Sequence, residues 1–215
     1  MIAVPEFGVR LEAARIVAVV TLERESDAAP LAQALAEGGI RAVEVALRTP
    51  ASLEALHAMR FARPDFLLGA GTALNGAQVE AAKVAGADFA LAPGLDAETV
   101  KHAARIGLPF MPGVATASEI QAAAGLGCQL LKFFPAEPLG GARGLRTVAA
   151  PFQHLGMRFL PLGGITLAGM TDYLVEPTVI AVGGSWIAPS ELIRRGAWSE
   201  IQANAARAAA MVHQT

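Results

Sequence analysis

The chain has 215 residues, of which 53% are hydrophobic and only 17% are charged, and its formal net charge is −2. This composition favours one large hydrophobic core over a disordered or fibrous chain. The slightly acidic balance offers no basic surplus to bind a nucleic-acid backbone, and no apolar run reaches the roughly 18 residues of a membrane span. We therefore expect a protein that binds neither nucleic acid nor membrane.

The N-terminus and the cysteine content bear on the compartment. Residues 1–6 lack a basic start followed by an apolar stretch, so nothing there suggests export. Cys128 is the only cysteine, which excludes a disulfide within the chain and fits a reducing cytoplasm. A buried, inert thiol is the favoured interpretation of Cys128, with a nucleophile as the alternative.

Short apolar runs recur along the chain, and each is followed by an alanine-rich stretch of helical period. The runs are nearly continuously apolar, as expected of parallel strands that are covered on both faces. Eight strands are predicted, at residues 16–22, 42–47, 66–71, 89–93, 109–114, 129–134, 158–162 and 179–183.

The stretches between these runs carry helix-capping signals. Asn75 and Asp96 are expected N-caps, and Thr116 with Glu119 matches a capping box. Thr49 followed by Pro50 is interpreted as an N-cap and a first-turn proline. The repetition predicts a closed (β/α)8 barrel, a TIM barrel, as a single domain over residues 1–215. The alternative is an open doubly wound sheet, but no strand–helix turn has the glycine spacing of a dinucleotide-binding fingerprint.

In such a barrel the active site lies at the C-terminal ends of the strands. Lys132 is one of only three lysines, and it lies between apolar neighbours in a predicted strand. Burial of an unpaired ammonium lowers its pKa, and a neutral amine is a nucleophile toward ketones. The pattern equally allows a buried ion pair, or a side chain that reaches out of the barrel. The other residues at these ends are Glu44, Arg48, Thr72, Pro93, Pro112, Gly163, Gly164, Gly183, Gly184 and Ser185.

Glu44 and Arg48 belong to the end of the second predicted strand. Glu44 lies between two valines, so its carboxylate must point into the barrel or toward the helix layer. A charged residue inside a barrel near a strand end is a candidate general acid/base. Arg48 begins the loop and can bind a substrate carboxylate with two hydrogen bonds. A structural ion pair between the two residues is the alternative.

Two glycine pairs follow the seventh and eighth predicted strands. Barrels often bind a phosphate through backbone N–H groups of these two loops, and glycine allows the close approach. Gly163 and Gly164, with Gly184 and Ser185, are therefore candidates for phosphate binding, and tight turns alone are the alternative. No metal site is expected, because no histidine is near a second ligand at suitable spacing. The histidines are His57, His102, His154 and His213, which we interpret as surface or helix residues.

Seven colinear segments resemble those of the class I 2-keto-3-deoxy-6-phosphogluconate (KDPG) aldolases, which are grouped with the 4-hydroxy-2-oxoglutarate (KHG) aldolases. The Lys-Phe-Phe-Pro-Ala-Glu string at 132–137 and the Leu-Arg-Thr string at 47–49 are the most diagnostic. The resemblance covers nearly the whole chain from about residue 15. The segments are 38–50, 69–72, 92–95, 111–114, 132–137, 163–165 and 183–186.

The resemblance implies a role for each matched residue. Lys132 would be the Schiff-base lysine and Glu44 the general acid/base. Arg48 and Thr72 would hold the pyruvyl carboxylate, and Pro93 and Phe134 would line the pocket. The resemblance also implies a homotrimer that needs no metal or other cofactor. The phosphate would be received by Gly163, Gly164, Gly184 and Ser185.

One residue departs from the family pattern. KDPG aldolases are expected to carry Thr before the first glycine pair, where this chain has Leu162. Relatives specific for the galactonate epimer tend to be apolar there, so Leu162 is a candidate specificity residue. The expected reaction is cleavage of KDPG, or of a close 2-keto-3-deoxy sugar acid, to pyruvate and glyceraldehyde 3-phosphate. 2-Keto-3-deoxy-6-phosphogalactonate and 4-hydroxy-2-oxoglutarate are alternative substrates. A metal-free sugar-phosphate isomerase and a non-catalytic phosphosugar-binding barrel are alternative functions.

Overall fold

The computed structural model of the chain describes residues 6–212. The N-terminal residues interpreted as lacking an export signal lie almost entirely outside the described part, and so does His213. Among the described residues, no helix combines the length and the apolar character needed to cross a membrane.

The strands are parallel, and every predicted run overlaps at least one of them. The fifth run is divided in two at Pro112, because proline has no N–H to donate to a neighbouring strand. The last strand begins later than predicted, at Val182. The strands are β1 (Ile16–Val20), β2 (Ala42–Ala46), β3 (Leu67–Gly71), β4 (Phe89–Leu91), β5 (Phe110–Met111), β6 (Gly113–Val114), β7 (Leu130–Phe133), β8 (Arg158–Pro161) and β9 (Val182–Gly184).

The strands form two sheets that follow the order of the chain. One sheet has the order β5-β4-β3-β2-β1-β9, and the other has the order β6-β7-β8. The first strand therefore lies between the second and the last, as in a barrel and unlike a doubly wound sheet. An isolated bridge between Phe159 and Val179 joins β8 to the segment before β9. The prediction of a parallel α/β fold is confirmed.

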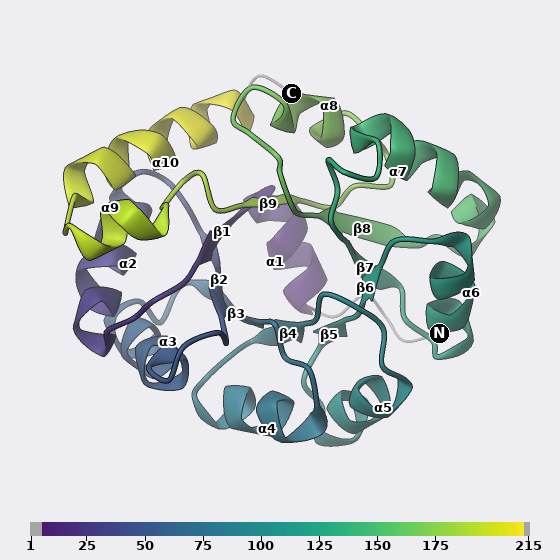
Figure 1. Ribbon diagram of the computed structural model, residues 1–215, viewed down its shortest axis with the longest axis horizontal. Helices are drawn as coiled ribbons and strands as arrows, with labels where there is room; N and C mark the ends of the chain where they lie inside the picture. The colour runs from purple at the N-terminus through teal and green to yellow at the C-terminus, as the bar shows by residue number, and fades with distance from the viewer. Residues whose placement is uncertain (1–5, 213–215) are drawn as a thin grey trace.

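The helices surround the strands, as Figure 1 shows. Most follow a strand and cover its outer face, and α1 is the exception. The helices are α1 (Glu6–Ala14), α2 (Ala28–Glu37), α3 (Ser52–Ala62), α4 (Gly76–Val84), α5 (Ala97–Ile106), α6 (Ala117–Gly125), α7 (Gly141–Ala149), α8 (Met170–Leu174), α9 (Ser190–Arg194) and α10 (Trp198–Val212), with short 3₁₀ helices at Glu25–Asp27 and Ala150–Leu155.

Helix α1 precedes the first strand and lies behind the strands in Figure 1. Phe7 and Leu11 of this helix belong to the inner cluster of buried residues, and the Phe7 ring stacks on Phe89 with centroids 5.5 Å apart. Phe89 is the first residue of β4. Helix α1 thus closes the N-terminal end of the strands and leaves the C-terminal end for a site. A second, larger cluster fills the space between strands and helices.

Three of the four predicted caps are confirmed. Asn75 and Asp96 accept hydrogen bonds from the first turns of α4 and α5, and Thr116 with Glu119 forms the capping box of α6. The prediction for Thr49 was wrong. Helix α3 begins at Ser52, and the Thr49 hydroxyl donates instead to the carbonyl of Leu22, which ties this loop to the one after β1.

Candidate active site

Lys132 and Glu44 meet inside the ring of strands. Lys132 lies on β7, and its Nζ is 3.6 Å from Oε1 of Glu44 on β2. Their side chains are only 3% and 1% exposed. Buried charges are stable only when they are paired. Of the two directions that the sequence allowed, the Glu44 carboxylate takes the inward one, toward Lys132, and Lys132 does not reach out to solvent.

The ion-pair partner of Glu44 is Lys132 and not Arg48. Arg48 is exposed beyond the end of β2, and its Nε donates to Oγ1 of Thr72 over 3.1 Å. The alternative of a structural pair between Glu44 and Arg48 is therefore contradicted. The guanidinium of Arg48 keeps its remaining N–H groups for other acceptors.

The Glu44 carboxylate has unused hydrogen-bonding capacity. Neither of its oxygens has a hydrogen-bond partner among the described residues, and both are buried. Gly71 at the end of β3 makes room for this side chain, because a Cβ at position 71 would lie 1.9 Å from Oε1 of Glu44. An unsatisfied buried carboxylate is costly, so the site is suited to a bound molecule that supplies a donor or a proton.

Thr72 follows Gly71 in a strained conformation. Its φ of 59° lies in the left-handed region, which a β-branched residue rarely adopts. Backbone strain of this kind is concentrated at functional sites. Here it holds the Thr72 hydroxyl beside Arg48, at the C-terminal end of the strands.

Pro93 and Phe134 follow β4 and β7, and both are half-buried. The ring of Phe134 lies 5.1 Å from Nζ of Lys132 and packs on the inner cluster. Gly113 lets β6 approach the end of β4, since a Cβ there would lie 2.2 Å from the Pro93 carbonyl. Phe134 thus gives the Lys132 amine an apolar neighbour, and Pro93 lies by Gly113, the register partner of Lys132.

The first glycine pair forms a left-handed turn after β8. Gly163 and Gly164 have φ values of 100° and 82°, which strongly favour glycine. Both residues face the loop after β7. A Cβ at Gly163 would lie 3.0 Å from the Phe134 ring, and one at Gly164 would lie 2.8 Å from Cβ of Glu137.

The second glycine pair serves a purpose that the sequence did not reveal. A Cβ at Gly184 would lie 1.4 Å from Cζ3 of Trp186, so the indole ring covers that face of the backbone. Residue 184 must therefore be glycine because the Trp186 ring occupies the place of a side chain. On this side of the backbone, the glycine does not serve the close approach of an anion. Ser185 lies between them and is exposed.

Leu162 lies on the inner face above Lys132. It belongs to the inner cluster and is 4% exposed. A Cβ at Gly183 would lie 2.7 Å from Cδ2 of Leu162, so the two residues are in direct contact. Lys132 is the register partner of Leu160 on the neighbouring strand. Leu162 is two residues beyond Leu160, so it lies on the same face and nearer the C-terminal end of the strands.

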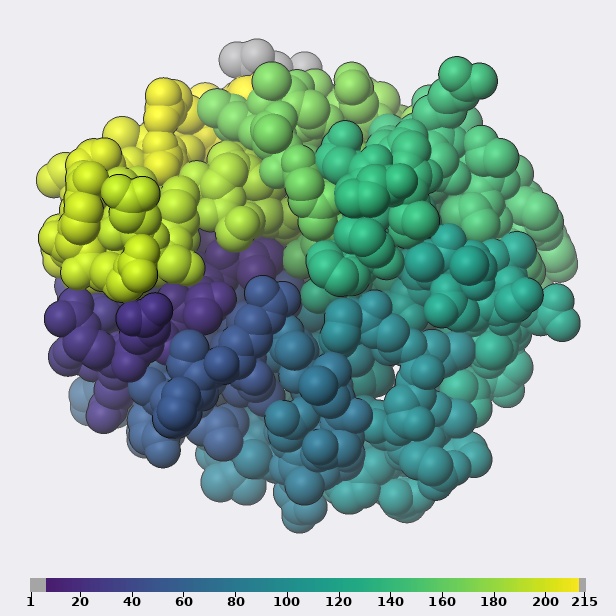
Figure 2. Space-filling model, viewed as in Figure 1, coloured from purple at the N-terminus to yellow at the C-terminus, as the bar shows by residue number. Residues whose placement is uncertain are grey.

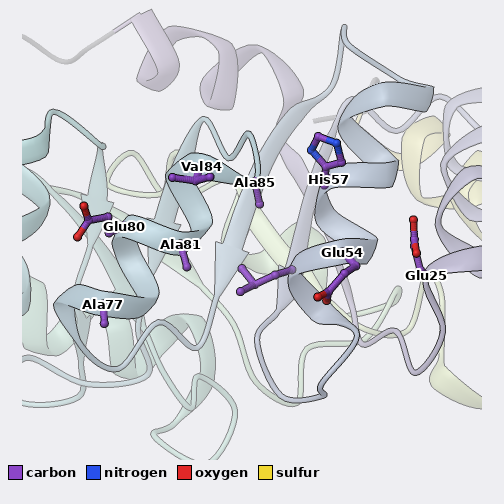
Figure 3. A pocket seen from close by; sticks show the side chains of 9 residues that line it. Glu25, Glu54, His57, Ala77, Glu80, Ala81, Val84 and Ala85 are labelled. Atoms are coloured by element: carbon purple, nitrogen blue, oxygen red, sulfur yellow. The ribbon is translucent and has the colours of Figure 1, made fainter.

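Two further features lie away from the residues around Lys132 and Glu44. Cys128 is half-buried, and burial raises the pKa of its thiol to about 11, which supports the interpretation as an inert thiol. An open groove of about 680 Å³ lies between α3 and α4 on the outer surface (Figure 3). Its apolar lining includes Leu53 and Val84, and Glu54, His57 and Glu80 line it as well. None of these residues lies at a strand end. No group of three or more His, Cys, Asp or Glu residues within 6–212 is arranged to hold a metal.

The family model described as KDPG and KHG aldolase matches residues 8–204 of the chain. The chain belongs to the KDPG and KHG aldolase family. It is 45% identical to the 2-dehydro-3-deoxy-phosphogluconate aldolase of Treponema pallidum, over 90% of this chain and 91% of that protein. It is 39% identical to the KHG/KDPG aldolase of Escherichia coli K12, over 86% of each chain.

Solved structures of this family have the same fold. The KDPG aldolase of Legionella pneumophila, with pyruvate captured at low pH as a covalent carbinolamine, superposes with a TM-score of 0.89 at 38% identity, and the alignment covers 94% of this chain and 97% of that one. The Zymomonas mobilis enzyme with 3-phosphoglycerate gives a TM-score of 0.88 at 38% identity, with 97% of both chains covered.

Sequence reasoning missed three residues that shape this site. Gly71 admits Glu44, Gly113 allows the close approach of two strands, and Trp186 covers Gly184. The signal for Gly71 was a glycine at the end of the strand next to one that carries a buried carboxylate. An aromatic residue directly after Gly-Gly-Ser was the signal for Trp186.

Proposed function

We propose that the protein is a class I aldolase that cleaves 2-keto-3-deoxy-6-phosphogluconate, or a close 2-keto-3-deoxy sugar acid, to pyruvate and glyceraldehyde 3-phosphate. The observation that carries the proposal is the buried Lys132 amine, 3.6 Å from a carboxylate that has no hydrogen-bond partner. The Legionella pneumophila relative, in which pyruvate is captured as a covalent carbinolamine, supports it.

The proposed reaction uses Lys132 as a nucleophile. Its amine adds to the C2 ketone and water leaves, which produces an iminium at C2. The iminium accepts the electrons of the C3–C4 bond while a base removes the C4 hydroxyl proton, and glyceraldehyde 3-phosphate departs. The resulting enamine is protonated at C3, and addition of water at C2 then releases pyruvate and restores the amine.

Glu44 is proposed to carry the protons in these steps. Its oxygens are within reach of the Lys132 amine, and they have no competing donors among the described residues. A carboxylate at this place can take the C4 hydroxyl proton and return it at C3, directly or through a water. Exclusion of water by the inner cluster strengthens its interaction with the charged iminium.

The remaining residues are proposed to bind the two ends of the substrate. Arg48 and Thr72, joined by a hydrogen bond, are proposed to hold the pyruvyl carboxylate. Pro93 and Phe134 would pack along the carbon chain, with Leu162 next to its middle carbons. The phosphate is proposed to bind the backbone N–H groups of the two glycine loops and the hydroxyl of Ser185.

The phosphorylated gluconate is the first choice of substrate, because four of the curated relatives carry that name at 39–45% identity over 88–93% of this chain. The galactonate epimer and 4-hydroxy-2-oxoglutarate are the alternatives.

We also propose that the two sheets complete an eight-stranded barrel, that residues 1–215 are one domain, and that the chain acts as a cytoplasmic homotrimer. The backbone hydrogen bonds between Phe159 and residues 178 and 180 support closure of the barrel. Exposed apolar side chains on α3 and at the end of α4, Phe61 at 88% and Val84 at 82%, support association with further copies. The single cysteine suits a reducing compartment.

Trapping with pyruvate and borohydride tests the aldolase proposal. We expect the wild-type chain to gain one reduced pyruvyl group, located by peptide mapping on Lys132. Lys132→Arg should gain none, because guanidinium stays protonated. Lys101→Arg is the matched control, since Lys101 is exposed and pairs with Glu98, and it should trap normally. A chain that binds phosphosugars without gaining the adduct would instead be an isomerase or a non-catalytic barrel.

A further inference from the structure

Glu137 is the last residue of the Lys-Phe-Phe-Pro-Ala-Glu string, and the proposed reaction gives it no role. It lies in the loop after β7 and is exposed. Its carboxylate accepts a hydrogen bond from the hydroxyl of Tyr173 on α8, with 2.7 Å between the oxygens. Tyr173 is the only tyrosine of the chain and is 1% exposed. A buried phenol on one helix thus anchors a surface carboxylate on a different loop.

Glu137 is also in contact with the first glycine pair. Its N–H donates to the carbonyl of Gly163 over 3.0 Å. A Cβ at Gly164 would lie 2.8 Å from Cβ and 3.1 Å from Cγ of Glu137, so the stem of this side chain packs against the Gly164 backbone. The neighbouring Ala136 N–H donates to the carbonyl of Leu162 over 2.7 Å. The loop after β7 therefore braces the loop after β8 along its length.

This bracing matters because of the residues that it holds. Two consecutive glycines in the left-handed region have more conformational freedom in the unbraced state than any other pair of residues. A loop that binds an anion through backbone N–H groups has to be ordered before binding, or the ordering weakens the affinity.

We propose that Tyr173 and Glu137 are positioning residues that hold the Gly163-Gly164 loop in the conformation that binds the substrate phosphate. The proposal rests on the function proposed above. Burial, together with the hydrogen bond to Glu137, raises the pKa of Tyr173, so the phenol stays a donor at neutral and moderately alkaline pH. Tyr173 acts only through Glu137, and Glu137 acts only through the glycine loop.

Two reactions of the same enzyme separate this role from a general structural one. Cleavage of 2-keto-3-deoxy-6-phosphogluconate uses the phosphate loop, whereas exchange of the C3 protons of pyruvate uses only Lys132, Glu44 and the carboxylate site. Tyr173→Phe removes the donor and keeps the ring. We expect the KM for the phosphorylated substrate to rise roughly 2- to 12-fold, the effect of one hydrogen bond, with kcat and pyruvate exchange unchanged.

The matched control is Glu176→Gln. Glu176 follows α8, is 7% exposed and accepts a hydrogen bond from Nε of Arg146 on α7, and none of its hydrogen bonds within the described residues goes to the glycine loop. This variant should melt at a lower temperature and keep the wild-type KM. Glu137→Gln combined with Tyr173→Phe should raise KM no further than the larger single effect, because both act through one contact.

The single tyrosine offers a direct measurement of the contact in solution. The ultraviolet absorbance of phenolate should appear at lower pH in Glu137→Gln than in wild type, since loss of the carboxylate charge removes part of what raises the pKa. The proposal would be overturned if the tyrosine titration shifts in Glu137→Gln while Tyr173→Phe keeps the wild-type KM. Equal losses of cleavage and of pyruvate exchange in Tyr173→Phe would overturn it as well. A wild-type enzyme that traps no pyruvate would contradict the proposed function instead, so the two failures are distinguishable.

Discussion

Lys132 and Glu44 are buried at a place where neither would be stable alone. Each would leave an unpaired charge in the core if the other were removed, and that costs several kcal/mol. Even together they leave both carboxylate oxygens without hydrogen bonds among the described residues. A chain selected only for stability gains little from such a pair, whereas a site that has to move protons beside an amine needs it.

Replacement of Glu44 by Gln tests its role in proton transfer. The amide keeps the shape of the side chain but cannot accept a proton at neutral pH. We expect the borohydride adduct still to form on Lys132, while exchange of the pyruvate C3 protons slows by about 10²- to 10⁴-fold. Exchange at the wild-type rate would show that Glu44 has only a structural role.

Gly71→Ala tests whether the placement of the carboxylate matters. The new methyl group would lie 1.9 Å from Oε1 of Glu44, so the carboxylate has to leave its position 3.6 Å from the Lys132 amine. We expect at least a 10²-fold loss in kcat, about the effect of removing a general base. Gly125→Ala is a useful control for glycine loss, because a Cβ at the end of α6 meets nothing within 4 Å and Gly125 does not have a positive φ. Retention of activity in Gly71→Ala would mean that the Glu44 position is not critical.

Leu162 is predicted to weaken the discrimination between gluconate-type and galactonate-type substrates. It lies on the inner face near Lys132 and has no hydrogen-bonding group, whereas Thr could bind a substrate hydroxyl. Leu162→Thr should raise the preference for the gluconate form by roughly 2- to 12-fold, the range of one neutral hydrogen bond. The measurement is the ratio of kcat/KM for the two epimers, and an unchanged ratio would place the selectivity elsewhere.

At the scale of the element, helix α6 begins at the same end of the strands as the site. Its capping box joins Thr116 and Glu119, and Glu119 also accepts from the N–H of Ala115. Helix α6 follows β6, which pairs with the strand that carries Lys132. A well-fixed N-terminus of α6 therefore helps to fix the loop beside the site.

Glu119→Gln should destabilise the folded chain in a pH-dependent way. Burial raises the pKa of Glu119, but hydrogen bonds from Ala115 and Thr116 outweigh it and lower the pKa overall. A lowered pKa stabilises the fold above the unfolded value of about 4.3, and this contribution is lost as the pH falls through the folded value. Urea unfolding should show a deficit of about 0.3–1 kcal/mol at pH 7, the effect of one charge near a helix N-terminus, and the deficit should shrink below about pH 4. A deficit that is constant with pH would contradict the role of the charge.

At the scale of the whole molecule, segments from the entire chain meet at one face. In Figure 2 this face is formed by parts coloured from purple to green around its centre. The proposed site residues come from the ends of β2, β3, β4, β7, β8 and β9, so the site needs the chain from the second strand to the last. Activity and folding should therefore be lost together on truncation of the last strand.

The proposed trimer makes a prediction about mass. Light scattering coupled to size exclusion should yield three times 22.2 kDa at micromolar concentration. Apolar side chains such as Phe61 are stable on a surface when a neighbouring subunit covers them. A mass of a single chain would contradict the trimer and leave the aldolase proposal intact, because both proposed catalytic residues belong to the same chain.

The sequence by itself determined the positions of the strands, most of the helix caps, and which lysine lies in a strand among apolar residues. These depend on local properties: the apolar run of a strand, the side chain at a helix N-terminus, and the scarcity of lysine in apolar surroundings. Lys132 could be singled out because its two competitors, Lys83 and Lys101, lie on the polar side of helical stretches.

Only the tertiary structure decided which side chains meet. Arg48 is nearer to Glu44 in sequence than Lys132 is, yet Lys132 is its partner, because the ring of strands brings β2 and β7 face to face. Helix α1 was absent from the prediction because its packing partners, such as Phe89, are far along the chain. Gly71 and Gly184 have meaning only beside Glu44 and Trp186. Contacts of this kind depend on which strands pair, in which register, and on how the sheets close. The hydrophobic periodicity of a sequence predicts neither the register nor the closure.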